Sequence, residues 1–184
     1  MEICCIFVGI YSVRWERGGE DAFQTTFREW QDVEALETFF EDNASDLKGG
    51  FFGRMTVERA VKATMLEAQK LERRFVELSK MEEKHACRQL ESMFRPLDDL
   101  QWRKKAFSFS KAKGSQSKSW LRLYAVKVDE GTFVITGGTI KLTHKLQERP
   151  HTRQAIKKLE QCLNFLKGSD VVDSDSLYEL VFDQ

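Results

Sequence analysis

Residues that could hold a phosphodiester and move a proton are concentrated near two β-rich segments in the last third of the chain. In residues 120–128 polar and apolar side chains alternate, which places Arg122 and Tyr124 on one face of a strand. In the next β-rich segment Lys141 points opposite to its apolar neighbours, and His144 follows closely. Together these four residues could supply the phosphate-binding cations and proton carriers that RNA cleavage by a 2′-hydroxyl requires. The same spacing is also typical of a solvated sheet face.

Further basic residues surround these segments. We predict that a set of them contacts RNA phosphates, and its members are Arg103, Lys104, Lys105, Lys111, Lys113, Lys118 and Lys145. No acidic residue occurs between Arg103 and Val128, and Trp102 and Trp120 could stack on bases. Segments rich in Lys and Ser are also common in solvated loops that bind nothing.

The charge of the chain is unevenly distributed, although its formal net charge is zero. Residues 1–100 carry 14 Lys+Arg against 20 Asp+Glu, residues 101–168 carry 15 against 4, and residues 169–184 carry none against 5. The three parts therefore have net charges of −6, +11 and −5, which sum to zero. A basic block of this kind indicates a surface that faces a polyanion.

The cysteines show no metal-binding spacing. Cys4 and Cys5 are adjacent, Cys87 and Cys162 are isolated, and none has a second Cys or a His at ligand spacing. No glycine-rich nucleotide-binding fingerprint occurs, so Gly137-Gly138 is interpreted as a bulge or a close backbone approach. We therefore expect no metal and no cofactor.

The longest apolar run predicts no membrane span. It covers residues 3–11, whereas roughly 20 residues are needed to cross a bilayer. Glu2 precedes the run where a secretory signal would carry positive charge. We expect a cytoplasmic protein with reduced cysteines and no membrane partner.

Apolar periodicity predicts the elements that must position these residues. In residues 3–13 both alternating faces are apolar, which predicts a central strand buried on both sides. Residues 21–30 fit either a short strand or an irregular segment. A short helix is expected over residues 33–42, and a long helix over residues 57–78, where apolar positions recur every three or four residues. The long helix could pack on the sheet or form an interface with another protein.

The second half of the chain has a different pattern. Residues 79–95 continue the helical part, a three-strand antiparallel meander follows, and one more helix closes the meander. We predict an α+β fold in which the N-terminal strand and the meander form an antiparallel sheet packed by a helix pair. The expected domain covers residues 1–168, with a helical segment over about 32–95 and a basic meander and helix over about 102–168. An acidic segment, 169–184, follows it.

This order of elements resembles the RelE/ParE toxin superfamily, in particular its HigB-like branch. The family carries a Leu-Arg pattern on one strand, which Leu121-Arg122-Leu123 matches. The next strand ends in a Gly-Phe-x-Lys-Lys-Thr type motif, which residues 138–143 (GTIKLT) match in part, and Pro150 and a helix follow as in the family. The resemblance covers about residues 100–167.

The resemblance implies an endoribonuclease that cleaves mRNA without a metal, free or on the ribosome, and that an antitoxin protein holds inactive. Arg122 matches the strand arginine of the family, and Lys141 matches the first lysine of its motif. Leu142 stands where the second lysine is usual, and Thr139 where phenylalanine is usual. The residue pattern and the resemblance together assign the catalytic role to Arg122, Tyr124, Lys141 and His144.

Two other functions are compatible with the same sequence. A non-catalytic adaptor would use the basic face to bind nucleic acid or an acidic protein. A structural interaction protein would use an exposed apolar stripe on helix 57–78 instead. An open surface around Arg122 and Lys141 would favour the enzyme.

Overall fold

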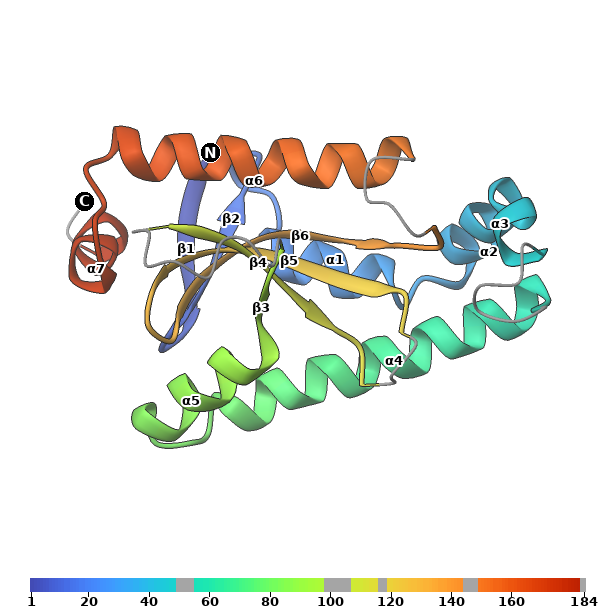
Figure 1. The fold of residues 1–184 in the computed structure, drawn as a ribbon, viewed down its shortest axis with the longest axis horizontal. Coiled ribbons are helices and arrows are strands. Elements are labelled where there is room, and N and C mark those ends of the chain that lie inside the picture. Colours follow the sequence, from blue (N-terminus) through green and yellow to red (C-terminus); the bar gives the residue numbers. More distant parts are fainter. Residues whose placement is uncertain (49–54, 98–106, 116–118, 144–148, 183–184) are drawn as a thin grey trace.

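The computed structural model describes residues 1–48, 55–97, 107–115, 119–143 and 149–182. These residues form an α+β fold with a six-stranded sheet between two layers of helices (Figure 1). The strands are β1 (Glu2–Phe7), β2 (Ile10–Arg14), β3 (Arg95–Pro96), β4 (Ser108–Lys113), β5 (Leu121–Asp129) and β6 (Thr132–Ile140). The helices are α1 (Ala22–Glu29), α2 (Val33–Asp42), α3 (Ala44–Lys48), α4 (Val57–Leu78), α5 (Glu83–Met93), α6 (Pro150–Gly168) and α7 (Ser174–Phe182).

The sheet is mixed, with the order β1-β2-β6-β5-β4-β3. The predicted three-strand meander is confirmed, because β4, β5 and β6 pair antiparallel in sequence order. The prediction of an antiparallel sheet is wrong at one junction, where β2 pairs parallel with β6. That junction joins the N-terminal hairpin to the last strand of the meander, and a parallel neighbour requires a long crossover, which the helices supply.

The N-terminal apolar run is a hairpin rather than one central strand. Val8 and Gly9 separate β1 from β2, and Gly9 has a φ of +84°, which favours glycine. A side chain at Gly9 would also overlap the carbonyl oxygen of Gly131. β2 lies inside the sheet and β1 forms its edge, so the predicted central position holds only for the second half of the run.

Residues 21–30 form a helix, which neither sequence-based alternative anticipated. The carboxylate of Asp21 accepts hydrogen bonds from the backbone N–H groups of Phe23 and Gln24 and so caps α1. Phe27 and Trp30 lie one turn apart and are buried against the sheet. The apolar residues of this segment therefore form the buried stripe of a short amphipathic helix.

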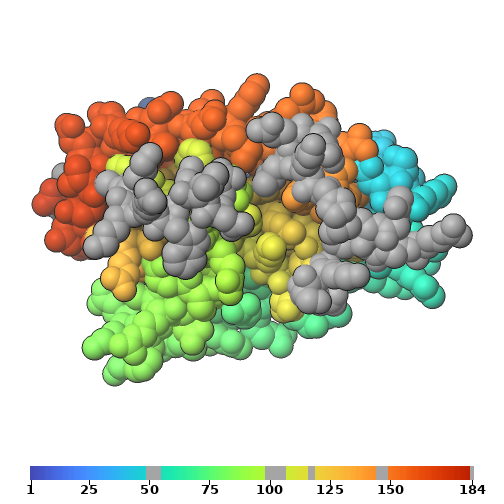
Figure 2. Space-filling model, in the orientation of Figure 1, coloured from blue at the N-terminus to red at the C-terminus, as the bar shows by residue number. Residues whose placement is uncertain are grey.

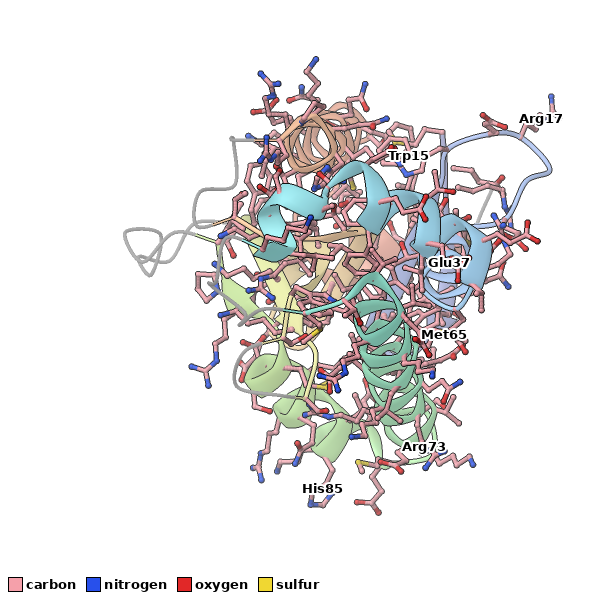
Figure 3. All side chains as sticks on the ribbon, turned by 90° about the vertical axis from the view of Figure 1, so that its right-hand side faces the viewer. Trp15, Arg17, Glu37, Met65, Arg73 and His85 are labelled. Carbon is pink, nitrogen blue, oxygen red and sulfur yellow. The ribbon has the colours of Figure 1, made fainter. Side chains whose placement is uncertain are left out.

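Helices α1, α2, α4 and α5 all pack on one face of the sheet, where only a pair of helices was predicted. The expected packing of α4 is confirmed, because its apolar stripe is buried in the core of this face, including Val61, Ala68, Leu71 and Phe75. In Figure 1 α4 runs along the lower side of the sheet, and in Figure 3 Met65 and Arg73 lie along it. The heptad-like spacing thus serves the core.

The opposite face of the sheet is covered by α6, which packs on β5 and β6 and runs along the upper side in Figure 1. α6 begins at Pro150 and confirms the predicted closing helix. The acidic C-terminal segment adds α7, which docks through buried Leu177 next to β1. Among the described helices none is long and apolar enough to cross a membrane.

Candidate functional site

Four basic residues gather where β3, β4 and β5 lie side by side. Lys113 of β4 is directly opposite Arg122 of β5, and Arg95 of β3 is directly opposite Lys111 of β4. Because side chains alternate along a strand and directly paired residues share a face, all four lie on the face that α6 partly covers. Arg95, Lys111, Lys113 and Arg122 are called the cationic cluster below.

Arg122 and Lys111 are the two half-buried members of the cationic cluster. Nη1 of Arg122 donates to the carbonyl oxygens of Ser119 and Leu121, both at 2.7 Å. Desolvation by burial lowers the pKa of the guanidinium. No carboxylate of the described residues pairs with it, although a half-buried cation without a counter-ion lowers stability. Such a group is a candidate for binding an external anion.

Lys113 extends the positive charge toward solvent. Its pKa is lowered by burial first, and then by the charges of Arg122 and Arg95. The ammonium of Lys111 donates to the carbonyl oxygen of Leu97 at 3.0 Å. Arg95 and Lys113 are exposed, so the cationic cluster presents at least two cations to the surface beside the half-buried guanidinium.

Tyr124 is placed differently from the sequence-based prediction. It lies on the same face as Arg122, but it is fully buried among residues such as Val126 and Leu159 beneath α6. Its hydroxyl has no hydrogen-bonding partner among the described residues, and burial raises the pKa of the phenol. The alternation assigned the correct face, but α6 covers that face at this position.

Lys141 is one residue beyond the end of β6. Its backbone N–H donates to the carbonyl oxygen of Trp120 at 2.8 Å, which continues the β5–β6 ladder by one step. The side chain is half-buried and alternation places it on the face of Arg122. His144, the fourth predicted catalytic residue, lies outside the described residues.

The predicted RNA-binding residues divide into two groups. Lys111 and Lys113 lie on β4, not in a loop as the Gly, Ser and Lys content suggested. The others lie outside the described residues: Arg103, Lys104, Lys105, Lys118 and Lys145. In Figure 2 the chain around the end of β4 and the start of β5, coloured yellow, reaches the surface between α6 and α4.

Trp120 is not available for stacking on a base. It is buried, its indole Nε1 donates to Thr64 Oγ1 at 2.9 Å, and its ring packs edge-on against Phe40. Gly137 and Gly138 behave as expected from the sequence. Gly137 lies beside a register shift between β5 and β6, and a side chain at Gly138 would overlap the Trp30 ring.

Sequence reasoning missed Arg95, which forms part of a two-residue strand that pairs with β4. Pro96 follows it, and Pro after a helical stretch indicates only that the helix ends. The position of Arg95 opposite Lys111 depends on strand pairing, so no local signal in the sequence identifies it. Among the described residues no group of three or more His, Cys, Asp or Glu side chains is arranged to hold a metal ion.

No family model, curated protein or solved structure matches the chain.

Proposed function

We propose that the chain binds RNA through the cationic cluster and acts on mRNA as a RelE/HigB-like toxin. The observation that carries the proposal is the half-buried guanidinium of Arg122, held by two backbone carbonyls and flanked by Lys113 without a carboxylate partner among the described residues. A phosphodiester would supply the missing negative charge. Of the two motif residues that led to the resemblance, Arg122 belongs to the cationic cluster, and alternation places Lys141 on the same face of the sheet.

The chemistry assigned to this surface is mainly electrostatic. Attack of a ribose 2′-oxygen on the adjacent phosphorus builds negative charge on the phosphoryl oxygens, and a fixed guanidinium stabilises that charge. Arg122 is suited to this role because its carbonyl contacts restrict the side chain before RNA binds. Tyr124 is not assigned a proton-transfer role, since its hydroxyl is buried. The partners that follow from the proposal are RNA, free or on the ribosome, and a cognate antitoxin protein.

A second candidate function is a non-catalytic adaptor that binds RNA through the same cluster. It is favoured by the burial of Tyr124, which removes one of the four residues expected to carry the reaction. The two functions share the RNA-binding surface and differ only in cleavage.

Binding of single-stranded RNA over a range of salt concentrations tests the shared part. Lys113→Gln and Arg122→Gln should each weaken binding regardless of sequence and lower the salt dependence by about 0.7 in log–log slope per phosphate contact. Lys157→Gln, at an exposed position of α6, is the matched control and should change little. If the wild-type protein does not bind RNA at low salt, the proposed surface is wrong.

Induced expression separates the toxin from the adaptor. The toxin should arrest growth and cut mRNA, and Arg122→Gln should relieve arrest by lowering cleavage roughly 100- to 1,000-fold, as loss of one transition-state donor does. A thermal melt of each variant shows whether the fold is intact. If RNA binds but stays uncut both free and with ribosomes, the adaptor function takes the place of the toxin.

A further inference from the structure

A cavity of about 440 Å³ lies at the edge of β6, between α1 and α2 on one side and α6 on the other. Its walls include Trp30 and Phe39, and its polar groups include His151, Gln154 and Lys158. The volume falls in the range of small-molecule sites, which combine apolar walls with a few polar groups. Arg122 is not part of its lining.

The floor of the cavity is a strand edge without a neighbouring strand. The last pair between β2 and β6 is Ser12 with Ile135, whereas β6 continues to Ile140. Backbone groups beyond Ile135 therefore have no partner strand on this side. Unpaired strand edges readily accept hydrogen bonds from, and donate them to, a further molecule.

Two aromatic side chains occupy the ends of this free edge. The indole Nε1 of Trp15 donates to the carbonyl oxygen of Thr136 at 3.1 Å. At the other end the Nε2 of His151 lies 3.0 Å from the carbonyl oxygen of Ile140 and donates to it, since a carbonyl can only accept. Backbone direction alternates with a period of two, so the N–H and C=O of Gly138 point from the same edge into the cavity.

The size of the free edge selects the ligand. Between the two aromatic contacts this edge offers the N–H and C=O of Gly138 and, next to them, the N–H of Ile140. This stretch is too short for an added peptide strand. A nucleobase matches it, because each base carries a hydrogen-bond donor next to an acceptor on one edge. Gly138 also lacks a side chain, so the Trp30 ring lies directly against the backbone and forms an apolar wall beside those two groups.

The charges around the cavity are suited to a nucleotide rather than to a bare heterocycle. The ammonium of Lys158 lies 5.5 Å from the centre of the Trp15 ring, on the α6 side of the cavity, and Figure 3 shows Trp15 next to α6. Glu29 lines the α1 side. A phosphate is therefore expected toward α6, near Lys158 and Gln154.

We propose that this cavity binds the base of a nucleotide through the Gly138 backbone, with its phosphate toward Lys158. The nucleotide is either a free mononucleotide or an unpaired residue of an RNA, since both present the same base edge. The inference does not rest on the proposed function, because the residues that form the site differ from the cationic cluster.

Calorimetric titration of the full chain with AMP, GMP, CMP and UMP tests the proposal, with ribose 5-phosphate as the ligand without a base. Nucleotides should bind with a Kd of about 1 mM or tighter, and purines more tightly than pyrimidines because they bury more apolar area. Ribose 5-phosphate should bind at least roughly tenfold more weakly. A short single-stranded RNA in the same titration distinguishes the two sources. If only the RNA binds, and Ala35→Trp weakens that binding, the ligand is an RNA base.

Two pairs of variants locate the site. Ala35→Trp, at an exposed position that lines the cavity, should block it and weaken binding roughly tenfold or more, whereas Thr38→Trp on the same helix should not. Lys158→Gln should weaken nucleotide binding more than Lys157→Gln. Lys113→Gln should leave mononucleotide binding unchanged even where it lowers binding of long RNA. The proposal is overturned if neither the mononucleotides nor the RNA binds. It is also overturned if Ala35→Trp changes the affinity for neither the mononucleotides nor the RNA.

Discussion

Lys113 and Arg122 lie directly opposite each other on β4 and β5, with their like charges on the same face of the sheet. Opposed like charges on neighbouring strands lower stability, and the lowered pKa of Lys113 reflects the repulsion in addition to burial. The pair therefore lowers the stability of the fold and at the same time concentrates positive charge at one place on its surface. That relationship is typical of a binding surface.

Lys113→Gln should therefore raise the free energy of unfolding, by roughly 0.2–1 kcal/mol, while it weakens RNA binding. This increase in the free energy of unfolding should become smaller at high pH. The pKa of Lys113 is lowered from its usual value of 10.5, so in the folded protein the ammonium loses its proton, and the repulsion disappears, at a lower pH than for an ordinary lysine. Lys111→Gln is the matched comparison, since Lys111 also faces a like charge, Arg95, but its ammonium donates to the Leu97 carbonyl. Loss of that bond should make Lys111→Gln less stable than Lys113→Gln. Urea denaturation measures both. Equal destabilisation by the two variants would show that the repulsion is negligible.

Tyr124→Phe should stabilise the protein, or leave its stability unchanged. The buried hydroxyl has no partner among the described residues, and an unsatisfied buried group costs about 1–3 kcal/mol. RNA binding and any growth arrest should also stay unchanged. Denaturation and the expression assay test the two parts separately, with Tyr178→Phe as the exposed control. Loss of arrest in a folded Tyr124→Phe protein would restore the catalytic assignment that the alternation in β5 suggested.

His151 should make stability decrease as the pH falls through 6.5, the usual pKa of a histidine. Its pKa is lowered, chiefly by burial and also by Arg149, against the opposing effects of the Ile140 carbonyl and Asp46. As the pH falls, His151 is protonated near pH 6.5 in the unfolded chain and only at lower pH in the folded protein. The contribution of His151 to the free energy of unfolding is therefore present above pH 6.5 and is lost as the pH falls below it. Between pH 7.5 and 5, His151→Gln should lose less of its free energy of unfolding than the wild type does.

This effect is isolated by subtracting the free energy of unfolding of the variant from that of the wild type at each pH. Carboxylates titrate in both proteins, so their effect cancels in the difference. His85→Gln serves as the control, since His85 is an exposed residue of α5 and Figure 3 shows it at the surface. A wild-type curve parallel to that of His151→Gln would mean that His151 is protonated equally in the folded and unfolded states.

Local patterns in the sequence were sufficient for much of the fold. The spacing of Val61, Ala68, Leu71 and Phe75 predicted both α4 and its buried face, because helical periodicity follows from backbone geometry alone. Alternation in β5 placed Arg122 on the correct face for the same reason. The meander and the closing helix α6 were also readable, since each has a turn or a helix start in the sequence.

Only the tertiary structure decided the features that depend on which elements meet. Alternation gives Tyr124 a face but not the helix that covers it, and α6 buries Tyr124 while Arg122 on the same strand stays half-buried. The pairing of Arg95 with Lys111 and the parallel contact of β2 with β6 join residues far apart in the chain. The free edge at Gly138 exists because β2 diverges after Ser12, and strand pairing between distant segments is set by packing of the whole core rather than by either segment alone.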